Sequence, residues 1–115
     1  MKVFYCDEYD LDLGEEHPIV KDKSKRVADS IKNSGLNVEI IKSKIPDKED
    51  FLRVHSKRYF KAAMTGYPIN IAVSSGLSLS LQWFDGLATQ ALHTNGGCID
   101  ASKAALEDGI SANLA

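Results

Sequence analysis

Residues 2–6 read Lys2-Val-Phe-Tyr-Cys6, a short run rich in Val, Phe and Tyr that is typical of a buried strand. Residues 21–34 follow with apolar side chains on one helical face, and Gly35 supplies the left-handed stop that helices favour at their carboxyl end. Residues 37–42 are rich in Val and Ile and indicate a second strand. The order strand, helix, strand predicts a right-handed parallel crossover.

The segment after the second strand predicts a helix over residues 48–65. Asp47 stands at its start, where a carboxylate can accept from the amides of the first turn. Ser56 can cap a continuation of this helix. The sequence Gly66-Tyr67-Pro68 is expected to end it.

The C-terminal part predicts a helix over residues 78–108 and a strand over residues 110–115. Leucines and serines alternate over residues 77–81 as they would in a strand, whereas the apolar spacing from Phe84 onwards is helical. Asn95-Gly96-Gly97 is expected to break or kink the helix. Together these elements predict an α/β fold with a partial parallel sheet of about three strands and flanking helices.

The composition suits one domain over residues 1–115, with 43% apolar residues, 26% charged residues and a net charge of -2. A pI of about 5.9 gives no electrostatic argument for nucleic acid or an anionic membrane. The chain turns acidic before the apolar core of a signal peptide could develop, and Cys6 and Cys98 are expected to be reduced, buried thiols. We therefore expect a cytoplasmic protein with neither nucleic acid nor membrane as a partner.

Charge is distributed unevenly along the chain. The charged residues that follow residue 61 are Asp85, Asp100, Lys103, Glu107 and Asp108. Residues 62–84 carry no charge, yet their Gly, Pro, Asn and Ser content makes them a poor membrane span. So few charges in one half of a small domain predict a surface that further chain or a second subunit covers. A symmetric dimer through residues 69–84 or the C-terminal strand is the simplest such assembly.

Motifs that carry chemistry are sparse. The acidic run Glu8, Asp10 and Asp12 is reminiscent of a calcium loop, but its glycine falls one place late and Ile19 stands where the closing Glu belongs, which favours a solvated loop. The histidines lack the paired spacing of a zinc site; they are His17, His55 and His93. No nucleophile elbow, phosphate-binding loop or dinucleotide fingerprint occurs.

Several short motifs nevertheless occur in a distinctive order. They are His17-Pro18, Arg26-Val27, the run Leu52-Arg-Val-His-Ser-Lys-Arg-Tyr59 and Gly66-Tyr67-Pro68. In order and separation this set resembles the N-terminal part of zinc-dependent histone deacetylase-like amidohydrolases, especially bacterial and class IV members. Residues 91–115 are similar to the helix and strand that lead into the family's tandem-histidine loop. The resemblance implies the N-terminal half of the arginase/deacetylase fold.

The resemblance also implies roles for individual residues. Arg26 would lie near an internal cavity, where its guanidinium can hold departing acetate by a paired hydrogen bond. His93 is expected at a helix end, without a catalytic role. The residues that would border the substrate tunnel are His17, Pro18, Tyr67 and Pro68.

The catalytic groups of the family follow its last matching strand, and these 115 residues contain no tandem histidines. A deacetylase polarises the acyl carbonyl with zinc and activates water beside it. The chain is therefore expected to be inactive by itself and to hold no cofactor, with zinc only in a full-length relative.

Two functions of different classes remain. In the first, the chain is the N-terminal section of an amidohydrolase for acetyl-lysine or acetylated small amines, and its partner is the missing C-terminal catalytic part. In the second, it is a free-standing, non-catalytic binding or assembly module that associates with itself as a dimer.

Overall fold

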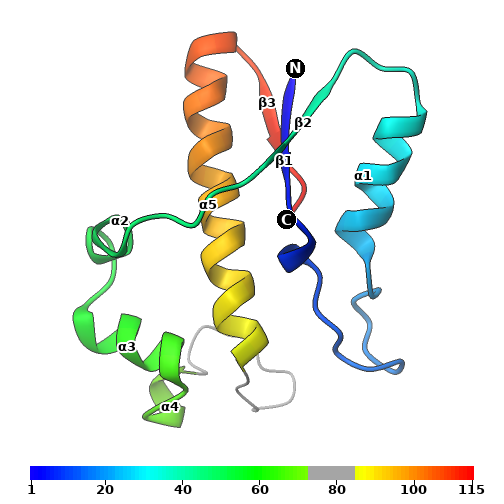
Figure 1. Cartoon of the computed structure of the whole chain (residues 1–115). Coiled ribbons are helices and arrows are strands. Elements are labelled where there is room, and N and C mark those ends of the chain that lie inside the picture. Colours follow the sequence, from blue (N-terminus) through cyan, green and yellow to red (C-terminus); the bar gives the residue numbers. More distant parts are fainter. Residues whose placement is uncertain (73–84) are drawn as a thin grey trace. The chain divides into compact units, whose positions relative to one another are not determined.

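The computed structural model describes residues 1–72 and 85–115 (Figure 1). It divides into two compact units, which we call the sheet unit (residues 1–45 and 90–115) and the helical unit (residues 46–89). The elements, in chain order, are β1 (Lys2–Tyr5), the 3-10 helix η1 (Asp7–Tyr9), α1 (Lys23–Asn33), β2 (Glu39–Lys42), α2 (Lys48–Leu52), α3 (Lys57–Thr65), α4 (Ile69–Ala72), α5 (Asp85–Asp108) and β3 (Ser111–Asn113).

The sheet unit is built on three parallel strands in the order β2-β1-β3. Val3 of the central strand pairs with Ile40 on one side and with Ala112 on the other. Val3, Phe4 and Tyr5 are all buried, because a central strand of a parallel sheet is covered on both faces. The α/β class and the three-stranded parallel sheet expected from the sequence are therefore confirmed.

Helices cover both faces of this sheet (Figure 1). Tyr5 packs in one core cluster with Ala28 of α1, whereas Phe4 packs in another with Ala101 and Ala104 of α5. Successive side chains of a strand point to opposite faces of the sheet, so Tyr5 faces α1 and Phe4 faces α5. The sheet unit has three layers, with β1 in the middle of the central one.

Helix α5 continues without interruption through Asn95-Gly96-Gly97, so the expected break is wrong. Both glycines are buried within the helix. A Cβ atom at Gly97 would collide with the hydroxyl of Tyr9 and with the side-chain amide of Asn113. Glycine serves here to let neighbouring segments approach the helix closely, and not to turn the chain.

The expected helix over residues 48–65 is two helices, α2 and α3, which residues 53–56 separate. The Ser56 side chain accepts from the Tyr59 amide at 3.1 Å, which confirms Ser56 as a cap. Asp47 holds the cap position of α2, but its side chain makes no capping bond, and its carbonyl accepts from the Asp50 amide at 3.0 Å instead. Gly66 ends α3 in the left-handed conformation, with φ of 75°.

The helical unit is held by contacts close in sequence. The rings of Phe51 and Phe60 lie 5.3 Å apart, and those of His55 and Tyr59 lie 5.0 Å apart. Residues 73–84, which include the expected start of the last helix and most of the expected dimer contact, lie outside the described residues.

Candidate functional site

The carboxyl ends of the three strands gather polar side chains at one edge of the sheet. Cys6 directly follows β1, Ser43 directly follows β2, and Asn113 is the last residue of β3. In open parallel sheets, ligands bind outside this edge at the point where the connecting helices diverge to opposite faces. Strand β1 is that point, because α1 and α5 cover opposite faces of it. This edge is therefore the candidate functional site.

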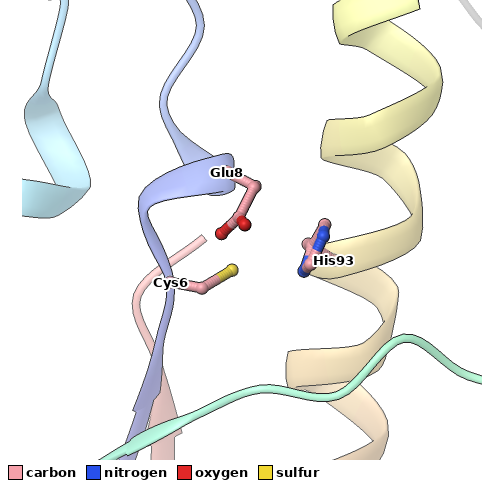
Figure 2. A group of neighbouring side chains, drawn as sticks. All are labelled: Cys6, Glu8 and His93. Carbon is pink, nitrogen blue, oxygen red and sulfur yellow. The ribbon is translucent and has the colours of Figure 1, made fainter.

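Cys6, Glu8 and His93 point toward one another at this edge (Figure 2). One donor atom from each residue lies within 4.8 Å of the other two: the Cys6 Sγ, a Glu8 carboxylate oxygen and a His93 ring nitrogen. Cys6 is 3% exposed and His93 is 8% exposed. Glu8, from η1, is half-buried. Thiolate, carboxylate and imidazole are the donors by which proteins bind zinc, so the cluster has a metal-ligating composition.

Two polar atoms of this cluster, His93 Nδ1 and Glu8 Oε2, are buried without a hydrogen-bond partner among the described residues. The other Glu8 oxygen lies 3.7 Å from the Lys42 ammonium, and the Cys6 Sγ accepts from the Ser43 hydroxyl at 3.3 Å. A buried polar group without a hydrogen-bond partner lowers the stability of the fold by about 1–3 kcal/mol. Such groups are therefore uncommon in protein cores, and each needs an explanation.

The electrostatics of the site keep its thiol protonated and its carboxyl charged. Burial raises the pKa of the Cys6 thiol, which the bond from Ser43 partly opposes. The backbone amide of Glu8 lowers the pKa of the Glu8 carboxyl, although partial burial works against it. Burial also raises the pKa of Tyr9 to about 12. At neutral pH the cluster therefore holds one carboxylate beside a neutral thiol, which is a poor nucleophile without a base or a metal.

Contacts on either side of His93 fix α5 against η1 and against β3. The Gln90 amide donates to the Tyr9 carbonyl at 2.8 Å, and the Asn113 amide donates to the Thr94 carbonyl at 3.3 Å. His93 lies between these anchors in the interior of α5 and is buried, so its expected position at a helix end is wrong.

One acidic side chain of the loop before α1 binds the amino end of that helix. The two oxygens of Asp10 accept from the amides of Ser24 and Lys25, at 2.9 and 2.8 Å. These amides belong to the first turn of α1, where they have no partner within the helix. Asp12 is an exposed partner of Lys21. Asp10 therefore acts as a helix cap from outside the helix, which agrees with the preference for a loop over a calcium site.

Two other expectations concern side chains of the sheet unit. His17 lies in the loop between η1 and α1, where its Nδ1 accepts from the Ile19 amide at 3.1 Å, and Pro18 beside it is exposed. Arg26 lies on α1 with 69% of its side chain exposed, and its Nε donates to Asp22 at 3.1 Å. Cys98 is exposed, so the expectation of two buried thiols is wrong for that residue.

The remaining tunnel residues, Tyr67 and Pro68, belong to the helical unit. A cis peptide bond joins them, and Tyr67 is 78% exposed. His55 is also exposed, and its ring lies against that of Tyr59.

Comparisons of the chain with models of protein families, with curated proteins and with solved structures gave no match. None of the helices in residues 1–72 and 85–115 combines the length and apolar character needed to cross a membrane.

The cluster of Cys6, Glu8 and His93 did not emerge from the sequence. Ligand spacing along the chain gave no signal, because His93 lies far from the other two residues in sequence. The position of Cys6 at the end of a predicted parallel strand was the available clue, since the carboxyl edge of such a sheet is where sites form.

Proposed function

We propose that the chain is the N-terminal section of a histone deacetylase-like zinc amidohydrolase, a class that hydrolyses acetyl-lysine or acetylated small amines. The sequence resemblance described above supports this proposal. The single structural observation that favours it is the position of the loop that bears His17-Pro18. This loop leaves the carboxyl end of β1, the central strand of the parallel sheet, where ligand sites of such sheets form.

In this proposal the chain contributes substrate contacts and not the reacting groups. His17 and Pro18 would form part of the rim of the substrate tunnel, and the resemblance assigns Tyr67 and Pro68 to the same role. Hydrolysis needs a polarised carbonyl and an activated water, and these 115 residues lack the tandem histidines that serve as base in the family. These residues also lack the two Asp and one His that bind zinc in the family. In this proposal the chain therefore catalyses no step by itself.

Arg26 already holds a carboxylate, Asp22, through its Nε. Acetate is a carboxylate of similar geometry, so the proposed role in an acetate channel requires Arg26 to exchange Asp22 for acetate. Because 69% of the Arg26 side chain is exposed, this role also requires further chain to cover it.

Sequencing the gene downstream of codon 115 tests the proposal. We expect an open frame that continues into a Gly-Gly-x-His-His segment, and we expect the extended protein to hydrolyse an acetyl-lysine peptide or an acetylpolyamine. In the extended protein, Arg26→Ala should slow turnover by about tenfold, whereas Lys23→Ala on the same helix should not. A stop codon directly after residue 115 would overturn the proposal.

A second candidate, a self-associating assembly module, is favoured by the sheet edges. The three-stranded order leaves β2 and β3 each with one strand neighbour among the described residues. Ile110, which directly precedes β3, is 60% exposed, and Leu106 in the last turn of α5 is 89% exposed. Unpaired strand edges beside exposed apolar side chains favour pairing between chains.

Sedimentation at micromolar concentration tests this second candidate. We expect a dimer whose dissociation constant rises in the Ile110→Asp variant. The control is Lys32→Asp, at an exposed position of α1, and it should leave the dissociation constant unchanged. A monomer at all concentrations would contradict it.

A further inference from the structure

The candidate site contains three donors of different chemistry that converge from two segments. Cys6 and Glu8 come from the end of β1 and from η1, and His93 comes from α5 (Figure 2). Their donor atoms lie within 4.8 Å of one another. His93 is more than nine-tenths buried, and its Nδ1 has no hydrogen-bond partner among the described residues. A buried group of this kind needs an explanation, and a bound ion is one that also accounts for the two neighbouring donors.

We propose that Cys6, Glu8 and His93 bind a single divalent transition-metal ion of the zinc class. This inference does not rest on the proposed deacetylase function, and it replaces the expectation from the sequence that the chain holds no metal. The family's own zinc ligands are two Asp and one His that come later in its sequences, so this site would be a different one.

The donor set selects the class of metal. A thiolate and an imidazole are ligands for zinc and its neighbours, whereas calcium and magnesium prefer oxygen ligands alone. Three protein ligands leave a fourth tetrahedral position for water or another ligand, which is the arrangement of open zinc sites. Of the three side chains, Glu8 is the most exposed, with 36% of its side chain accessible to solvent.

The geometry requires only a small contraction. Neighbouring donors of a tetrahedral zinc lie about 3.5 Å apart, given zinc bonds of roughly 2.0–2.3 Å. The donor atoms, which lie within 4.8 Å of one another, therefore need to approach by about 1 Å, and small side-chain rotations can provide this movement. Cys6 would give up its thiol proton to solvent on binding, and Glu8 Oε2, which has no hydrogen-bond partner among the described residues, could coordinate the metal ion.

The surrounding structure supports a fixed site. Gln90 and Asn113 anchor α5 on either side of His93, and Gly97 allows the close approach of Tyr9 and Asn113. The Ser43 hydroxyl donates to the Cys6 Sγ at 3.3 Å, and such a bond stabilises a thiolate once it forms.

Titration of the 115-residue chain with Co²⁺, followed by competition with Zn²⁺, tests the inference. Cobalt takes the geometry and ligands of zinc, and sulfur ligation adds a charge-transfer band in the near ultraviolet. We expect one equivalent of Co²⁺ per chain, the sulfur band, and displacement by Zn²⁺. Zinc should also raise the melting temperature of the chain.

Matched variants identify the ligands. Cys6→Ser should abolish the sulfur band, whereas Cys98→Ser should keep it. His93→Gln should weaken binding on the order of 100-fold, whereas His55→Gln, an exposed change in the helical unit, should not. Glu8→Gln should weaken binding by about tenfold or more. Because Glu8 is partly exposed, this variant should still fold even if substitution of Cys6 or His93, which are buried, unfolds the chain.

Three results would overturn the inference: the absence of saturable binding at micromolar metal, a sulfur band that follows Cys98 instead of Cys6, or affinity that neither Glu8→Gln nor His93→Gln alters. None of these results bears on the gene sequence beyond codon 115, so failure here is distinguishable from failure of the deacetylase proposal.

Discussion

The sheet unit and the helical unit are stabilised in different ways. In the sheet unit, β2 and the distant C-terminal strand β3 flank β1, and the buried apolar residues include Val3, Phe4 and Tyr9. In the described part of the helical unit, the buried apolar residues are Ala62 and Ala72. The sheet unit thus depends on contacts between distant segments, and the helical unit on caps and ring contacts between near neighbours.

This difference bears on where a site can be held precisely. A metal or substrate site needs side chains whose positions packing fixes, and Cys6 and His93 are buried between a strand end and a long helix. The helical unit buries less apolar surface, so its helices belong to the low-stability end of the molecule, where local opening occurs most easily. Its exposed Tyr67 suits contact with a partner or substrate more than a fixed catalytic role.

The largest effect is expected from truncation of one phenylalanine in each unit. Phe4→Ala leaves a cavity against Ala101 and Ala104 and should lower the free energy of unfolding by about 3–5 kcal/mol. Phe51→Ala should cost about 1–2 kcal/mol, because Phe51 is only half-buried. Urea unfolding followed by circular dichroism measures both. Equal losses would break the distinction between the two units.

A smaller effect is expected at Gly97. Gly97→Ala places a methyl group against Tyr9 and Asn113, and we expect a loss of about 1–3 kcal/mol in the free energy of unfolding. Asn95→Ala, at an exposed position of the same helix, is the control and should be neutral or slightly stabilising, because alanine favours helix. Stabilisation by Gly97→Ala would show that α5 does not need this close approach.

The sequence predicted the sheet unit well because its signals are local. In the sheet unit these signals are the strand at β1 and the stop at Gly35, each of which depends on residues within a few positions. The cap at Ser56 in the helical unit is a local signal of the same kind. The sequence failed where a distant neighbour decides the outcome. Gly97 lies within the continuous helix α5, where its lack of a side chain leaves room for Tyr9 and Asn113, and a glycine pair alone gives no hint of that contact.

The same reason explains the candidate site. Asp10 caps α1 from outside the helix, and His93 meets Cys6 only after the sheet has formed. Spacing rules for metal ligands and helix caps describe residues that are close in sequence, so they missed both.

The Asp10 cap gives the next effect in size. Asp10→Ala removes the acceptors of the Ser24 and Lys25 amides and should lower the free energy of unfolding by about 1–2 kcal/mol. Hydrogen exchange should show faster opening at the start of α1. Asp12→Ala is the control, because its exposed ion pair with Lys21 contributes little. Equal exchange rates in the two variants would mean that Asp10 is not the cap.

The smallest effect is expected at Ser56, the cap of α3. Its Oγ accepts from the Tyr59 amide, and Ser56→Ala should cost about 0.5–1 kcal/mol, the usual loss for an exposed cap. Because α3 belongs to the helical unit, the loss should appear as faster hydrogen exchange over α2 and α3, with little change in the strands β1–β3. Ser56→Asp keeps an acceptor at the cap and should restore the slower exchange. If Ser56→Ala instead accelerated exchange equally in β1 and in α3, the two units would open as one, and the difference in how they are stabilised would have no consequence for their dynamics.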